Sequence, residues 1–165
     1  QKEFPPPFSN RRFDAEGFFH FGDRLYIITK NQSDPFDGIA HVYSIPDSAG
    51  TYTAKKELQF ATCEKRKKCR VTDAALSPDG NRLVLLGYGT LWVFEDFREK
   101  KFGNGPTLML DVGASTQLEA VCFVNNTLLY LADERMMNSG GYLYEFPLPQ
   151  KSKPKPKENR KPSDP

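Results

Sequence analysis

Three acidic residues open similar segments of this chain, and together they could bind a cation. The segments are 14–18, 72–76 and 118–122, and their acidic residues are Glu16, Asp73 and Glu119. Ca²⁺ binds about six to eight oxygen ligands, with carboxylates foremost among them. If the segments lie side by side in the fold, these carboxylates would form a calcium site. Asp14 would stand close to Glu16 in the same group.

The same carboxylates could instead hold the fold together. A carboxylate can accept hydrogen bonds from backbone N–H groups of a neighbouring repeat, and such charge-assisted bonds are stronger than neutral ones. Both roles need only an acidic side chain at this place, so the sequence leaves both open. The structural role is the one that we favour.

Further charged residues follow the first long apolar run of two copies. Lys30 and Asp133 are expected at equivalent places, as is Tyr88, and Glu134 follows directly. Lys30 could contact a phosphate or carboxylate group, while Asp133 and Glu134 would join the carboxylates that face a central channel. We favour the alternative, salt bridges between repeats, because a catalytic site requires convergent geometry that a sequence does not show.

Each acidic residue is followed by two apolar runs, so the segments belong to a longer repeat. The first runs are 25–29, 83–87 and 128–132, and the second runs are 41–45, 91–95 and 142–146. Repeats of about 40 to 60 residues built from short strands are typical of β-propeller blades. The sequence therefore predicts an all-β propeller fold. Because the first run is continuously apolar, we expect that strand to be buried on both faces.

The repeats divide the chain into a leading segment, three blades and a tail. Consecutive prolines at 5–7 favour an extended leading segment over residues 1–12. The blades are expected at about 13–60, 70–112 and 116–148. A fourth, outer strand fits residues 54–60 and 107–112, whereas the third copy ends at Pro147 without one. The Lys/Pro-rich residues 149–165 predict a disordered tail.

Three blades are too few to close a ring, because closed propellers contain about four to eight. Uncovered blade edges would also invite aggregation. We therefore expect this chain to be part of an incomplete propeller. Another polypeptide, or an amino-terminal half missing from this chain, would supply the remaining blades.

Composition and charge exclude some classes of protein. The 165 residues are 38% hydrophobic and 27% charged, with a formal net charge of +2, as in ordinary globular domains. Basic residues concentrate in 151–165, so the folded body is mildly acidic, which argues against binding nucleic acid. No apolar stretch reaches the roughly 18 residues that a transmembrane helix needs.

The cysteines indicate the compartment. Cys63 and Cys69 bracket a short basic run and can close a small disulfide ring. Zinc is not expected, because His20 and His41 are isolated in the sequence. Cys122 lies in an apolar run and is expected to pack as a small hydrophobic side chain. A disulfide implies an oxidising location: secreted, periplasmic, or associated with the outer membrane or cell surface.

Several motifs resemble one family of proteins. They are residues 13–17, 26–30, 71–74, 77–80, 117–120 and 133–134. They resemble secreted bacterial propeller proteins that are frequent in Bacteroidetes and distantly similar to esterase-like phytases and other six-bladed propellers. The resemblance covers residues 12–148 and matches the carboxy-terminal half of such proteins. It implies a propeller that is six-bladed when complete, a bacterial surface location, a place in a membrane-associated protein complex, and metal in the central channel.

Function is less defined than fold, because propellers host many activities. No nucleophile, phosphate-loop or dinucleotide motif is present in the sequence. We therefore expect a non-enzymatic, extracytoplasmic interaction or accessory subunit. The alternative is a calcium-dependent phosphoesterase that uses Glu16, Asp73 and Glu119 for Ca²⁺ and Lys30 for phosphate. A carbohydrate-binding module is a third possibility, which would need exposed aromatic side chains at one end of a blade, with Trp92 and the tyrosines as candidates.

Overall fold

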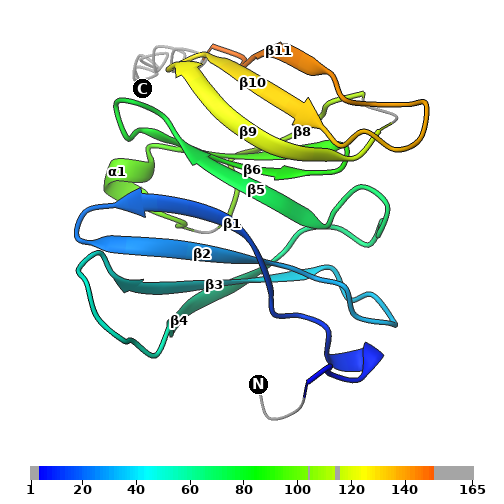
Figure 1. Cartoon of the computed structure of the whole chain (residues 1–165). Coiled ribbons are helices and arrows are strands. Elements are labelled where there is room, and N and C mark those ends of the chain that lie inside the picture. Colours follow the sequence, from blue (N-terminus) through cyan, green and yellow to red (C-terminus); the bar gives the residue numbers. More distant parts are fainter. Residues whose placement is uncertain (1–3, 104, 114–115, 151–165) are drawn as a thin grey trace, which may run out of the picture.

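Three antiparallel β-sheets make up the computed structural model, which describes residues 4–103, 105–113 and 116–150 (Figure 1). The first blade consists of β1 (Asp14–Phe21), β2 (Arg24–Lys30), β3 (Ile39–Pro46) and β4 (Lys55–Ala61). The second consists of β5 (Val71–Leu76), β6 (Arg82–Gly87), β7 (Thr90–Glu95) and β8 (Leu108–Asp111). The third consists of β9 (Leu118–Asn125), β10 (Leu128–Asp133) and β11 (Leu143–Pro147). The strands of each sheet pair in chain order, as propeller blades do.

The fourth strands follow the sequence prediction. They form in the first and second blades, as β4 and β8, and the described part of the third blade ends with its third strand. Two short helices were not expected. A single 3-10 turn, η1 (Phe8–Asn10), interrupts the leading segment just after its prolines, and one turn of α-helix, α1 (Phe97–Lys100), follows β7.

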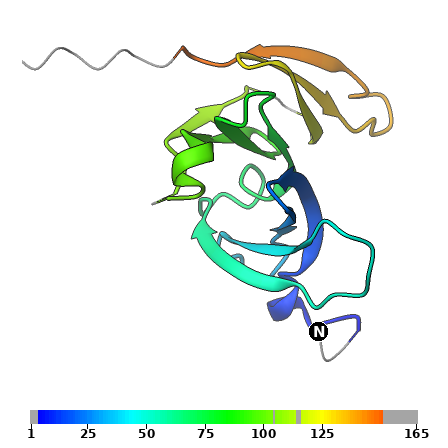
Figure 2. The ribbon, with the colours of Figure 1, turned by 90° about the vertical axis from the view of Figure 1, so that its left-hand side faces the viewer.

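The three sheets stack face to face with the second in the middle (Figures 1 and 2). One apolar layer lies between the first and second blades and contains Ile28, Trp92 and Phe97. Another lies between the second and third blades and contains Leu86 and Leu129. Burying each such side chain stabilises the fold by about 1.5–3 kcal/mol.

Of the three second strands, only that of the middle blade is buried on both faces. Every residue of β6 is buried, because alternate side chains point into the two apolar layers. In β2 and β10 the burial is mostly on one face. The prediction of two-sided burial is therefore wrong for the first and third blades, which have a neighbouring sheet on one side only.

The innermost strands bring the acidic segments together. Strand β5 contacts β1 on one side and β9 on the other. Gly17 of β1 makes this approach possible, because a Cβ atom there would lie 3.3 Å from the Cβ of Ala74 in β5. The three segments identified from the sequence thus lie side by side along one edge of the stack.

Candidate functional site

A β-bulge in each innermost strand fixes which residues correspond between blades. The residues displaced by the bulges are Glu16, Thr72 and Glu119. Asp73 instead follows its bulge and corresponds to Gly17 and Ala120. The predicted equivalence of the three acidic residues is therefore wrong by one position in the second blade. A bulge adds a residue without changing the apolar pattern, so the sequence does not show which residue it displaces.

The same strand registers show that the predicted equivalence of Lys30 and Asp133, at the ends of the second strands, is also wrong. Lys30 corresponds to Tyr88 and Glu134, whereas Asp133 corresponds to Gly87 in the second blade. Lys30 and Asp133 therefore occupy neighbouring positions of the repeat, and not the same one.

Lys30 joins the carboxylates of the first and third blades. Its Nζ lies 3.4 Å from Glu16 Oε1 and 3.5 Å from Glu119 Oε2. The Lys30 side chain is 8% exposed, and both glutamates are 28% exposed. These residues border a depression of about 490 Å³ that also includes Asp133 and Glu134. Lys30 thus neutralises two carboxylates that would otherwise face each other.

Burial and neighbouring charges shift the pKa values of Lys30 and Glu16 in opposite directions. Burial lowers the pKa of Lys30, but hydrogen bonding to Tyr88 and the charges of Glu119 and Glu16 outweigh it, so the pKa of Lys30 is raised. Burial raises the pKa of Glu16 above 4.5, although Lys30 acts against that shift. Lys30 is therefore a firmly charged ammonium group at neutral pH.

Asp73 makes hydrogen bonds to backbone amides in two blades. Its carboxylate accepts from Val121 N of the third blade at 2.8 Å and from Ala74 N of its own blade at 2.7 Å. The neighbouring Thr72 hydroxyl donates to Leu118 O at 2.8 Å. Burial raises the pKa of Asp73 despite these two amide donors. Asp73 is thus engaged in joining the second blade to the third.

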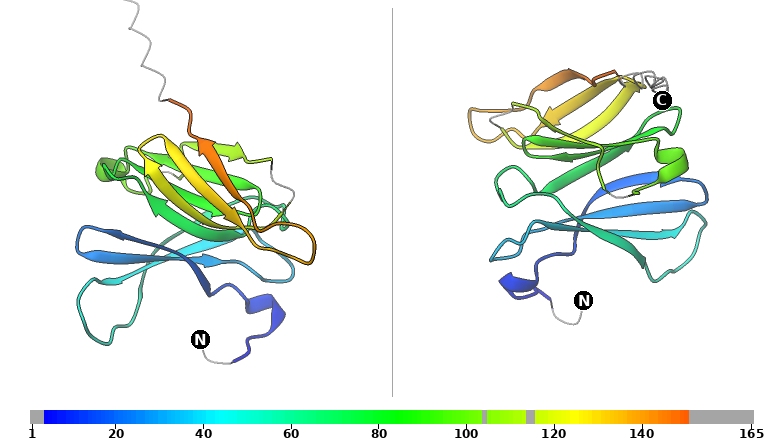
Figure 3. Two further views of the ribbon diagram at one scale, coloured as in Figure 1. Left: turned by 45° about the horizontal axis from the view of Figure 1, so that its top comes forward. Right: turned by 180° about the vertical axis from the view of Figure 1, so that it is seen from behind.

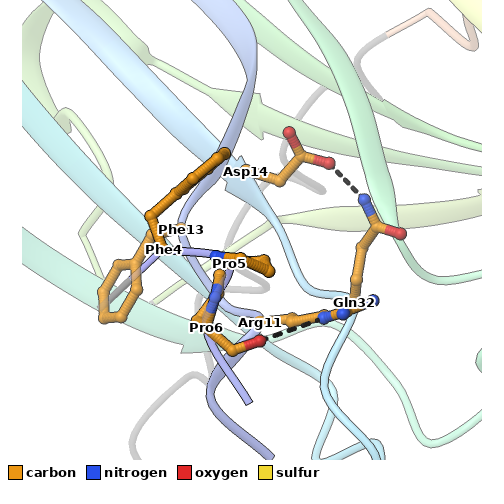
Figure 4. A pocket seen from close by; sticks show the side chains of 7 residues that line it. All are labelled: Phe4, Pro5, Pro6, Arg11, Phe13, Asp14 and Gln32. Atoms are coloured by element: carbon orange, nitrogen blue, oxygen red, sulfur yellow. Dashed lines mark hydrogen bonds between the residues drawn. The ribbon is translucent and has the colours of Figure 1, made fainter. Parts of the chain in front are cut away.

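Asp14 is close enough to Glu16 to help raise the pKa of that residue, but it lines a different pocket. It accepts a hydrogen bond from Gln32 Nε2 in a pocket of about 380 Å³ beneath the leading segment (Figure 4). Phe4, Pro5 and Phe13 line the same pocket, and Arg11 Nε donates to Pro6 O across its floor at 3.3 Å.

Asp133 organises the third blade. It accepts hydrogen bonds from the Thr116 hydroxyl, from Tyr142 N at 2.6 Å and from the Tyr144 hydroxyl at 2.8 Å. Burial raises the pKa of Asp133, but these hydrogen bonds outweigh it and hold the pKa below 3.8. Glu134 donates its backbone N–H to Gln117 O at 2.9 Å. Both acidic residues border the depression around Lys30.

The predicted calcium ligands do not fit that role in this arrangement. The Lys30 ammonium lies between Glu16 and Glu119, where a cation would have to stand, and Asp73 is engaged with backbone amides. Across residues 4–103, 105–113 and 116–150, no group of three or more His, Cys, Asp or Glu side chains could hold a metal ion. The geometry supports the structural role that the sequence left open.

Tyr88 lies close to two cations, a feature that was not predicted from the sequence. Lys30 Nζ lies 5.0 Å from the centre of its ring, and the Arg70 guanidinium carbon lies 4.7 Å from it. Such distances are typical of cation–π contacts. A signal existed in the basic run that leads into β5, but the sequence did not show that this run faces Tyr88.

The structure confirms the predicted disulfide and contradicts the predicted burial of Cys122. Cys63 and Cys69 form a disulfide, with their Cα atoms 5.6 Å apart. Cys122 is exposed, and it is not packed as a hydrophobic side chain. It points from β9 to the face of the third blade opposite the apolar layer, where the described residues provide no neighbouring sheet.

Trp92 does not provide a carbohydrate platform. It is fully buried in the layer between the first and second blades. No helix in the described ranges is long and apolar enough to cross a bilayer.

Comparison with known proteins shows the fold. The β-propeller domain of Cps50 (Swd1) from Myceliophteria thermophila matches with a TM-score of 0.52 at 14% sequence identity. The match covers 82% of this chain but only 40% of that chain. No family model and no curated protein matches the sequence, so the expected bacterial family and the phytase similarity gain no support.

Proposed function

We propose that this chain is a non-enzymatic interaction unit of a β-propeller. Further propeller blades pack against its two outer faces, which are the faces of the first and third blades that point away from the second. The observation that carries the proposal is a pair of sheet faces with apolar side chains at the two ends of the stack, where no other sheet of the described residues covers them (Figure 3). Large contiguous apolar surfaces mark sites of protein association.

The outer face of the first blade is a row of apolar side chains. Phe18, Ile27 and Tyr43 lie side by side across β1, β2 and β3, and Leu25 pairs with Ile45 in the next row. Phe18 is 52% exposed, whereas Phe19, next to it in sequence but on the opposite face, is buried. The outer face of the first blade therefore carries apolar side chains of the kind that pack between blades, but no sheet of the described residues covers it.

The outer face of the third blade has the same character. Ala120, Ala132 and Leu143 lie side by side across β9, β10 and β11. In the next row Cys122 pairs with Tyr130, and the charged Glu145 lies beside Tyr130 on the edge strand. Leu143 is 66% exposed. Because propeller blades pack face to face, sheets of the same type are the occupants that these two surfaces fit best.

An extracytoplasmic location, at a bacterial cell surface or in a membrane-associated complex, is part of the proposal. The Cys63–Cys69 disulfide supports it, because disulfides persist in oxidising compartments. Alkylation of intact cells before lysis tests the location. If both cysteines are alkylated without a reductant, the chain resides in a reducing compartment and this part is wrong.

Native and denaturing mass measurements on protein purified from its source cells test the assembly. We expect a species heavier than the 18.7 kDa of this chain, carrying additional propeller sheets. Phe18→Asp and Leu143→Asp should each abolish it. Thr53→Asp, in the exposed loop before β4, is the charge-matched control and should leave it intact. A stable monomer of this chain alone, or assembly that survives both face variants, would contradict the proposal.

A further inference from the structure

We infer that Arg70 and Lys67, beside Tyr88, form a binding site for a divalent oxyanion such as a sulfate or phosphate group. The site is a cavity of about 350 Å³ between the loops that precede β5 and β9. Its lining includes Lys67, Lys68, Arg70, Tyr88, Gly89, Thr116 and Gln117. Three of these side chains are cationic, and none of them is acidic.

Arg70 is the strongest indication of a missing acceptor. Its Nε–H is buried and has no hydrogen-bond partner among the described residues. Buried polar groups are nearly always paired, so this donor calls for an acceptor. No acidic side chain in the described ranges forms a salt bridge with Arg70, and its guanidinium group lies over the Tyr88 ring.

The backbone holds Arg70 in place from both sides. Cys69, directly before it, is buried and bonded to Cys63, and Val71, directly after it, is buried at the start of β5. Stacking on Tyr88 then fixes the plane of the guanidinium group, which can present parallel N–H donors to an oxyanion. The site is therefore formed before any ligand arrives.

The disulfide loop supplies the second cation. Within it, Lys68 N and Cys69 N both donate to Lys65 O, at 2.8 and 2.9 Å, so the loop has a defined turn. Lys68 Nζ is paired with Asp111 at 2.7 Å. Lys67 has no such partner in the described structure. Lys67 and Arg70 thus leave the site with two uncompensated positive charges, which a divalent anion would match.

Lys30, the other cation beside Tyr88, provides a contrast that supports the inference. Lys30 is also buried and lies over the same ring, but Glu16 and Glu119 neutralise it. The two cations beside Tyr88 are therefore not interchangeable. Of these two cations, only Arg70 lacks a carboxylate partner among the described residues and lines the cavity.

NMR of the arginine Nε–Hε signals, during titration with sodium sulfate against sodium chloride at matched ionic strength, tests the site directly. We expect a saturable shift of the Arg70 signal and of the Lys67 and Gly89 amides with sulfate. An Arg70 signal that does not respond, or one that responds equally to chloride, would overturn the proposal.

Matched variants distinguish sulfate binding at this site from a general effect of the protein's charge. Arg70→Gln should weaken sulfate binding about tenfold or more, since a hydrogen bond to a charged group contributes about 1.5–3 kcal/mol. Lys67→Gln, on the exposed loop, should weaken it several-fold without affecting the fold. Lys56→Gln, on β4, removes the same charge elsewhere and should have no effect. Equal weakening by Lys56→Gln would contradict a specific site, and thermal unfolding without sulfate checks that each variant is folded.

Two probes distinguish the sources of the anion. A sulfated disaccharide that binds more tightly than inorganic sulfate, with the same dependence on Arg70, indicates a group carried on a larger ligand. Equal affinity for inorganic sulfate, inorganic phosphate and the disaccharide indicates a free ion. If none of the three binds, the proposal fails, whatever the outcome for the outer faces of the blades.

Discussion

The carboxylate of Asp73 in the second blade accepts a hydrogen bond from the backbone N–H of Val121 in the third, at 2.8 Å. Together with its bond from Ala74 N, this contact ties two innermost strands to one side chain. It is a direct polar connection between neighbouring blades at the edge where they come closest.

Asp73→Ala should lower the free energy of unfolding by about 2–3 kcal/mol, because each buried donor left unpaired costs about 1–3 kcal/mol. Urea unfolding measures the loss. Hydrogen exchange should accelerate at Val121 more than within the apolar layer between the first and second blades. Uniform acceleration throughout the chain would show that Asp73 does not act at the contact between the second and third blades.

Lys30→Met should destabilise the fold by leaving Glu16 and Glu119 without their shared cation. Removing one partner of a fully buried ion pair costs about 3–5 kcal/mol. Both glutamates are partly exposed, so we expect a smaller loss of about 1–3 kcal/mol. Adding Glu16→Gln and Glu119→Gln to this variant should restore most of the lost stability. If the triple variant is no more stable than Lys30→Met, the ion pairs are not the source of the loss.

Calcium should not stabilise the protein, because the Lys30 ammonium stands between the two glutamates. Thermal unfolding with roughly 1 mM Ca²⁺, enough to occupy even weak extracellular calcium sites, should match unfolding with a chelator. A calcium-dependent rise in the unfolding midpoint that Glu16→Gln abolishes would restore the metal hypothesis.

Asp133 should make the protein sensitive to acid. Its hydrogen bonds hold the pKa below 3.8 in the folded state, so the folded state binds fewer protons than the unfolded state near that pH. This stabilisation is complete above pH 3.8 and is lost as the pH falls through the lower folded pKa. The gap in unfolding free energy between the protein and Asp133→Asn should therefore narrow on acidification. Asp23→Asn, in an exposed turn, is the control for charge, and a gap that does not vary with pH would contradict this role.

The thiols should differ in reactivity. Without a reductant, iodoacetamide should label Cys122 and leave Cys63 and Cys69 intact, as peptide mass mapping can check. Replacing both disulfide cysteines by serine should cost about 2 kcal/mol, the value expected for so short a loop. Cys122→Ser should change stability by less than about 0.5 kcal/mol. Labelling at Cys63 in the untreated protein would show that the disulfide does not form.

The fold could be predicted from the sequence because apolar runs and turn residues repeat along the chain. The same pattern indicated that the third blade lacks a fourth strand. The candidate site was harder to predict, because the register of the strands decides which side chains come together. A single displaced residue in each innermost strand separates Asp73 from Glu16 and Glu119, and no feature of the composition marks it. The position of Arg70 over Tyr88 depends on the register of β5 against β6, whose paired ends at Val71 and Gly87 place the two residues next to each other.

The disulfide also bears on what happens if the chain is cut. The exposed basic loop between Cys63 and Cys69 is the only covalent link along the backbone from the first blade to the second. Proteases that cleave after lysine or arginine would find their preferred residues there. Because Cys63 and Cys69 are bonded to each other, a nick within the loop would leave the two pieces tethered. The protein would then tolerate hydrolysis at its most accessible connection and would separate only on reduction.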